Sequence, residues 1–222
     1  CALTRTRPNN QDAAGITAFP LAERAKRHLL VELDALGFAT AGKADDPVNG
    51  LAFDLLSSTR QQVMIAHNNG VITIDLAEGD NAHRERIRAQ LDEPYRTMLG
   101  HFRHEVGHYF QWQRVESNPA LLEECRALFG DESADYQASV DRHYAVGPPA
   151  RWAKSYISMY ATMHPYEDFA ETWAHYLHIC DTIETAVSYG LVAAADVDGH
   201  ERFRDLVTAV WIPLSTALNL AN

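Results

Sequence analysis

Residues 93–112 read EPYRTMLGHFRHEVGHYFQW, and the pentapeptide HEVGH at residues 104–108 decides how the chain is interpreted. In an α-helix, residues four positions apart point the same way, so His104 and His108 would share one face and could bind one metal ion. Glu105 would lie beside them, where its carboxylate could act on a water molecule at the metal. This combination of side chains at this spacing is typical of zinc hydrolases.

The sequence around the pentapeptide predicts a single helix over residues 93–112. Pro94 suits the first turn of a helix, where its missing N–H costs nothing. Five apolar side chains recur at helical spacing and define a face that excludes the two histidines. They are Tyr95, Leu99, Phe102, Val106 and Phe110. Gly107 is unfavourable inside a helix, and the close approach of another backbone would explain its presence.

Composition limits the class of protein. The chain has 222 residues, of which 46% are hydrophobic, and this length suits one large domain or two lobes. No stretch approaches the roughly 18 apolar residues of a membrane span. The formal net charge of −11 argues against nucleic acid as a partner, because phosphate binding needs a basic surface. The oligomeric state is left open.

The three cysteines, Cys1, Cys125 and Cys180, do not form a disulfide framework, so a reducing, cytoplasmic location is the simpler expectation. The sequence begins at Cys1, and two explanations are open. Cys1 could be the lipidated first residue of a mature bacterial lipoprotein, which would be lipid-anchored. It could instead be the last cysteine of a metal-binding ribbon that lay upstream.

Periodicity along the chain predicts an α+β fold. Residues 1–20 are polar and contain Pro8, Asn9, Asn10, Gly15 and Pro20, and they are expected to form a linker or arm. Residues 21–38 form an amphipathic helix pattern, and the chain from residue 81 onward is almost wholly helical in pattern. Strands are expected at residues 51–56, 62–66 and 71–76, with a hairpin turn at residues 67–70. The expected architecture is zincin-like: a small mixed sheet above an active-site helix, followed by a mostly helical C-terminal body.

A second segment supplies candidates for the remaining metal ligand. A zinc hydrolase site usually has three protein ligands and one position open to water. Residues 160–175 read YATMHPYEDFAETWAH, and Pro165 suits the start of a helix there. Glu167 and Glu171 would then lie one turn apart on one face. Neither has a cationic partner four residues away, which favours a role in a buried site.

Three segments of the chain together resemble one bacterial family. They are LGHFRHEVGHYF at residues 99–110, FGDE at residues 129–132 and YATMHPYEDFAETWAHYLHI at residues 160–179. They are similar to the zinc-binding metallopeptidases that carry an N-terminal zinc ribbon, and the similarity spans about Leu21 to Gly190. The resemblance implies that residues 1–20 are the tail of such a ribbon and that residues 21–222 form the metallopeptidase domain.

The expected site also resembles that of lethal-factor-type gluzincins. In those enzymes a tyrosine lies seven residues before the third ligand, a glutamate, and a second glutamate follows one turn later. Tyr160, Glu167 and Glu171 reproduce that spacing. The resemblance implies that Glu167 is the third ligand, that Glu171 supports a ligand from behind, and that Tyr160 faces the reacting carbonyl.

These observations predict a zinc-dependent metallopeptidase acting on a peptide or protein substrate. Zinc bound by His104, His108 and Glu167 would lower the pKa of a bound water toward about 7. Glu105 would act as the general base, and Tyr160 would donate a hydrogen bond to the oxyanion. The strand at residues 71–76 would hold an extended peptide by edge pairing.

Two alternatives stay open at this point. The domain could be a non-catalytic zinc-binding interaction module, although a structural site has no use for Glu105. It could also hydrolyse a non-peptide amide. The other histidines of these segments, His101, His164, His175 and His178, are expected to lie in the core or on the surface rather than on the metal.

Overall fold

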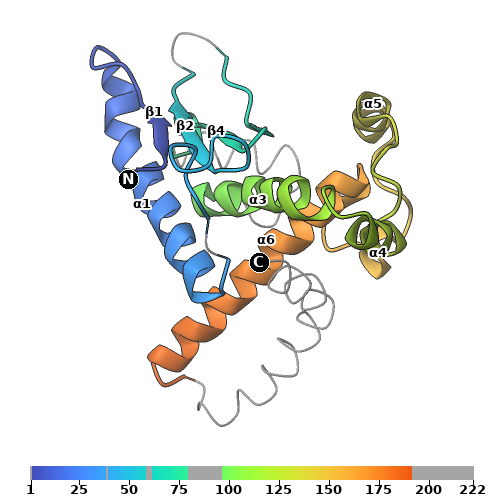
Figure 1. Ribbon diagram of the computed structural model, residues 1–222. Coiled ribbons are helices and arrows are strands. Elements are labelled where there is room, and N and C mark those ends of the chain that lie inside the picture. The colour runs from blue at the N-terminus through green and yellow to red at the C-terminus, as the bar shows by residue number, and fades with distance from the viewer. Residues whose placement is uncertain (1, 39, 59–61, 80–96, 192–222) are drawn as a thin grey trace.

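The structure, a computed structural model, describes residues 2–38, 40–58, 62–79 and 97–191. The expected α+β fold is confirmed: a small sheet and the long helix α1 (Ala13–Ala35) lie on one side of helix α3 (Met98–Phe110). Helix α6 (Pro165–Ser188) crosses α3, and two shorter helices lie at the far end of that crossing (Figure 1). These are α4 (Pro119–Phe129) and α5 (Tyr136–Val146).

The sheet has four strands in the order β1-β2-β4-β3. Strands β1 (Thr4–Thr6), β2 (Ala52–Leu56) and β4 (Val71–Asp75) run parallel, and β3 (Ala66–Asn68) pairs antiparallel with β4. The predicted strands at residues 51–56 and 71–76 are therefore present, and the predicted small mixed sheet is confirmed. Strand β4 continues into a 3₁₀ turn, η1 (Leu76–Gly79).

The hairpin between β3 and β4 is tighter than predicted. Asn68 pairs with Val71, so the turn contains only Asn69 and Gly70, whose φ angles of 47° and 77° are both left-handed. Two such residues form the turn that matches the natural twist of a hairpin. The predicted strand at residues 62–66 is wrong except at its last residue, since the ladder begins at Ala66 and runs into the predicted turn.

The sheet order also corrects the predicted role of residues 71–76. Strand β4 lies between β2 and β3, so both of its edges are already hydrogen-bonded. It cannot hold a peptide by edge pairing. On this side of the sheet, β3 is the outer strand.

Helix α1 begins earlier than predicted. The side chain of Asp12 caps it by accepting a hydrogen bond from the backbone N–H of Gly15 at 2.9 Å, and the helix continues through Pro20. Residues 4–6 join the sheet, where the Phe53 N–H donates to the Leu3 carbonyl at 2.8 Å. The expectation that residues 1–20 form an irregular arm is thus wrong for β1 and for the first turns of α1. Their origin as the tail of a ribbon stays a prediction.

Helix α3 is shorter than predicted. Thr97 is extended (φ −136°, ψ 161°), and its hydroxyl accepts a hydrogen bond from the Gly100 N–H at 2.9 Å, so Thr97 is the N-cap. The prediction of one continuous helix from residue 93 is therefore wrong. Residues 93–96, which were expected to form its first helical turn, lie outside the described residues. At its C-terminal end α3 passes into a wider π-helical turn, η2 (Gln111–Val115).

The apolar face predicted for α3 forms the centre of the core. Phe102 and Val106 are fully buried and Phe110 nearly so, whereas Tyr95 lies outside the described residues. The Phe102 ring meets Phe53 of β2 edge-on, with 5.6 Å between ring centroids. Because this face packs against the sheet, the face of α3 that carries the histidines packs against α6.

Two contacts fix α3 against α6. At Gly107 the helices approach so closely that a Cβ atom there would lie 3.0 Å from Ala170 Cα and 3.3 Å from Trp173 Cβ, as predicted from the glycine. One turn away, Arg103 is 1% exposed and donates hydrogen bonds to Glu32 of α1 at 2.9 Å and to Asp181 of α6 at 2.8 Å. These two points set the relative orientation of the helices.

Gly107→Ala is expected to destabilise the protein although alanine is the better helix former. The gain in helix propensity is about 1 kcal/mol, whereas forcing a methyl group against the α6 backbone costs about 1–3 kcal/mol. Thermal unfolding should show a lower Tm, and Gly107→Val should lower it further. A higher Tm for Gly107→Ala would contradict the close approach of the two helices.

Candidate metal centre

Three side chains converge where α3 crosses α6. His104 and His108 of α3 place their Nε2 atoms 3.1 Å apart, and Glu167 of α6 places its Oε2 atom 3.0 Å from His104 Nε2 and 3.5 Å from His108 Nε2. One ligand atom from each residue lies within 4.8 Å of the others. Within the described ranges, these three residues form the group that could hold a metal ion.

The donor set fits a zinc ion. Glu167 is 2% exposed, and its Oε2 accepts no hydrogen bond among the described residues although it faces both imidazoles. A buried carboxylate oxygen without a donor is costly, and a cation between the three ligand atoms would satisfy it. Two imidazole nitrogens and one carboxylate oxygen are also the ligand types that catalytic zinc sites use.

Glu171 lies behind the first histidine. Its Oε1 accepts a hydrogen bond from His104 Nδ1 at 2.8 Å, which puts the proton of a neutral ring on Nδ1 and leaves the Nε2 lone pair facing the cluster. Metal-binding histidines commonly have this arrangement. Glu167 and Glu171, one turn apart on α6, thus contact opposite edges of one imidazole ring.

Charge is concentrated at this point. Burial lowers the pKa of His104, but the two carboxylates beside it, Glu167 and Glu171, outweigh burial and hold that pKa well above its usual value. Burial raises the pKa of Glu167, but the nearby imidazoles of His108 and His104 hold it well below its usual value. Without a metal, the cluster therefore favours an ionised carboxylate with a positive charge beside it, and a metal cation could supply that charge in place of the His104 proton.

Glu105 is buried beside the three residues. It is 7% exposed, its Oε2 accepts no hydrogen bond among the described residues, and burial raises its pKa despite the nearby histidines. A carboxylate in this state binds a proton more readily than one in water. It is also without the donor that a purely structural acid of this burial would normally have.

The two tyrosines that precede Glu167 lie on different sides of it. Tyr160, in the 3₁₀ turn η4 (Tyr160–Thr162), places its ring 5.9 Å from the His104 ring, and burial raises its pKa far above the usual value. Tyr166 stacks on His164 with 5.3 Å between ring centroids and bonds to Glu116. Tyr160 is thus the tyrosine of this pair that adjoins the metal ligands.

The other histidines have separate roles in the structure. The four histidines that were not expected to bind the metal contact protein groups. His164 caps α6 and donates to the Ala134 carbonyl. His175 donates to the Glu171 carbonyl. His101 pairs with Glu78, and His178 contacts Arg103. None of the four belongs to the ligand group found in the described part of the chain.

The contact between Tyr136 and Glu167 was not predicted from the sequence. The Tyr136 hydroxyl donates to Glu167 Oε1 at 2.8 Å from the first turn of α5. The two residues are 31 positions apart in the sequence, and no motif links them. Only the FGDE segment just before α5, which the family resemblance includes, pointed toward this region.

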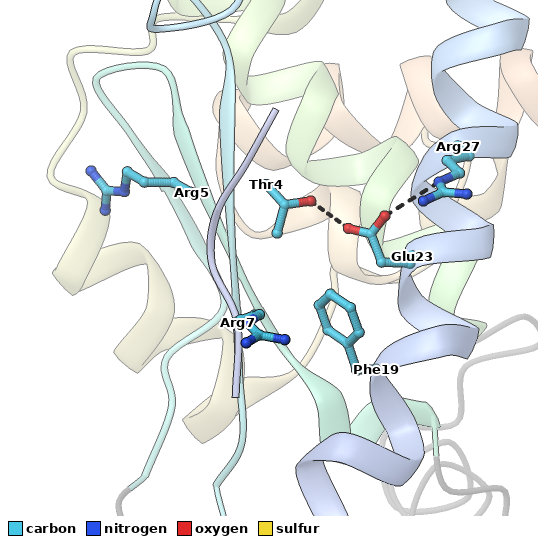
Figure 2. A pocket seen from close by; sticks show the side chains of 6 residues that line it. All are labelled: Thr4, Arg5, Arg7, Phe19, Glu23 and Arg27. Atoms are coloured by element: carbon cyan, nitrogen blue, oxygen red, sulfur yellow. Dashed lines mark hydrogen bonds and ion pairs between the residues drawn. The ribbon is translucent and has the colours of Figure 1, made fainter. Parts of the chain in front are cut away.

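A hollow of about 380 Å³ lies between β1 and α1, away from the ligands. Figure 2 shows its lining: Thr4, Arg5, Arg7, Phe19, Glu23 and Arg27. Arg5 is paired with Asp54, and Arg27 lies 3.3 Å from a Glu23 oxygen, so two of its three guanidinium groups are already balanced. The hollow brings no catalytic set together, and the candidate site is the metal centre.

Helix-borne histidines four residues apart, joined by a glutamate from a second helix, thus form a group that could hold a metal ion. The chain belongs to the family described as "Putative zinc-binding metallo-peptidase", whose model matches residues 16–222. This finding confirms the resemblance seen in the sequence.

Relatives in mycobacteria are identical to this chain at half of the aligned positions. Uncharacterized proteins of Mycobacterium bovis and of two Mycobacterium tuberculosis strains are each 50% identical over 227 aligned residues. The match covers 100% of this chain and 66% of each relative. No solved structure matches the chain. None of the described helices is long and apolar enough to cross a membrane.

Proposed function

We propose that the chain is a zinc-dependent peptidase in which His104, His108 and Glu167 bind the ion and Glu105 is the general base. The observation that carries this proposal is the convergence of three ligand atoms, one of which is a buried Glu167 oxygen without a hydrogen-bond donor among the described residues. The family to which the chain belongs supports zinc and peptide chemistry.

When bound, zinc would supply an acidified water and polarise the scissile carbonyl. Glu105 then accepts a proton from the attacking water and passes it to the leaving amine. Its burial supports this role because a carboxylate with a raised pKa can hold the proton between the two steps. Tyr160 remains a neutral phenol and can donate to the oxygen on which charge develops. Glu171 orients His104 through its Nδ1–H.

A peptide is the substrate that the surroundings favour. Strand β3 is one of the two outer strands of the described sheet, and His67 at its centre packs edge-on against Tyr109 of α3, with 6.0 Å between ring centroids. An extended peptide pairing with this strand would therefore lie along the helix that carries the zinc ligands. This position replaces the one predicted for residues 71–76.

The alternatives make different demands on the same residues. A zinc-binding interaction module would have no use for the buried carboxylate of Glu105, whereas hydrolysis of a non-peptide amide would use the same residues. The cytoplasmic location expected from the three cysteines stays a prediction.

His108→Ala should abolish stoichiometric zinc binding, because it removes one of three ligands. Metal analysis of the purified protein should give one zinc per chain for the parent. His101→Ala is the control, since His101 lies on the same helix and pairs with Glu78 instead. Full zinc content in His108→Ala would rule out the proposed ligand set.

Glu105→Gln should keep zinc and lose hydrolysis. The amide has nearly the shape of the carboxylate but cannot accept the proton, and general-base catalysis of this kind contributes about 10²–10⁴-fold. Zinc content and turnover of a peptide library should be measured on the same samples. Equal turnover in variant and parent would remove Glu105 from the mechanism. Zinc binding without turnover in either protein would support the interaction module.

Tyr160→Phe should lower kcat by about 10²-fold, the typical cost of one lost oxyanion donor, with zinc affinity nearly unchanged. Tyr166→Phe is the matched control, because its ring stacks on His164, whereas the Tyr160 ring lies beside His104. Steady-state kinetics on the best library peptide would separate kcat from KM. A Tyr160→Phe enzyme as active as Tyr166→Phe would show that the spacing shared with lethal-factor-type enzymes carries no catalytic role here.

A further inference from the structure

Helix α5 reaches the metal centre through its first residue. None of its residues is buried, and Figure 1 shows it standing apart from the body formed by the sheet, α1 and α3. Its N-terminal residue, Tyr136, is 43% exposed, yet its hydroxyl donates to Glu167 Oε1 at 2.8 Å. A surface helix thus contacts a buried proposed zinc ligand directly.

This hydrogen bond gives the two oxygens of the Glu167 carboxylate different neighbours. Oε1 accepts from Tyr136, whereas Oε2 faces both histidines at 3.0 and 3.5 Å and accepts no hydrogen bond among the described residues. The phenol is the donor in this contact, because a carboxylate oxygen can only accept. Its ring also packs edge-on against His164, the N-cap of α6, with 5.2 Å between centroids.

We propose that Tyr136 is a positioning residue of the metal centre, which occupies one Glu167 oxygen so that only the other can bind the ion. This inference rests on the proposed zinc site. A carboxylate without such a partner can bind a metal through both oxygens, and the second oxygen would take the position that the reaction leaves for water. By donating to Oε1, Tyr136 keeps one coordination position of the ion open for water.

The same contact links the ion to α5. Thermodynamic linkage is reciprocal, so the factor by which the Tyr136 hydrogen bond strengthens zinc binding is the factor by which zinc strengthens that contact. Other contacts hold α5 without the phenol: Arg142 donates to the Met163 carbonyl at 3.0 Å, and His164 donates to the Ala134 carbonyl at 3.0 Å. Removing the Tyr136 hydroxyl should therefore leave the fold intact and change only the linkage between zinc binding and the docking of α5.

Tyr136→Phe and Tyr144→Phe form a matched pair, because both change a tyrosine of α5 and Tyr144 is 63% exposed. Zinc Kd from chelator competition should weaken by about 10–100-fold in Tyr136→Phe, the usual effect of losing a residue that supports a ligand. Tyr144→Phe should match the parent. With cobalt in place of zinc, the visible absorption of Tyr136→Phe should weaken, as expected when the coordination number rises above four.

Amide hydrogen exchange supplies a second readout that does not depend on activity. Added zinc should slow exchange in α5 of the parent and of Tyr144→Phe, and should slow it less in Tyr136→Phe. Exchange in α1 should be equal in all three proteins, which would show that the fold is retained. A Tyr136→Phe protein with the parent's zinc Kd and cobalt spectrum would overturn the inference while leaving the zinc site standing. A His108→Ala protein that still binds zinc like the parent would overturn the site and this inference together.

Discussion

The direct packing of α3 on α6 is the constraint on which the rest of the site depends. Gly107 has no side chain, so the Ala170 backbone can approach within the distance that a Cβ atom would block. His104 and His108 flank Gly107 on α3, and Glu167 and Glu171 flank Ala170 on α6 at the same offsets, three residues before and one residue after. Since side chains three or four residues apart share a helix face, one backbone contact brings all four site residues together.

Charge balance explains why such a crossing is stable. The crossing buries several ionisable groups, and each would be costly alone. Arg103 pairs with both Glu32 and Asp181 one turn before Gly107, and it connects α1, α3 and α6. The cluster of His104, Glu167 and Glu171 holds an excess of carboxylate, and a bound cation would neutralise it. The charges around Arg103 orient the helices, and the charges around His104 suit a metal ion.

The ligands and the residue that supports Glu167 come from parts of the fold with different packing. Both ligand helices contribute fully buried residues to the core, which holds metal ligands in fixed positions. Helix α5 contributes no buried residue and depends on polar contacts. A change in how α5 docks would therefore alter the environment of Glu167 without disturbing the histidines. This arrangement gives the proposed peptidase one adjustable contact at an otherwise rigid site.

The sequence by itself determined the local features of this protein. The pentapeptide spacing placed both histidines on one face of α3, Pro165 marked the first turn of α6, and Gly107 implied a close backbone approach. These conclusions need only helix geometry and residue type. They fail at the ends of elements. The local caps Asp12 and Thr97, which the apolar periodicity does not show, set where α1 and α3 begin, and pairing with β2 brings residues 4–6 into the sheet. Tertiary structure alone decided that β4 lies inside the sheet and that Tyr136 contacts Glu167. Both outcomes depend on how separate elements pack, and no periodicity within either segment encodes that packing.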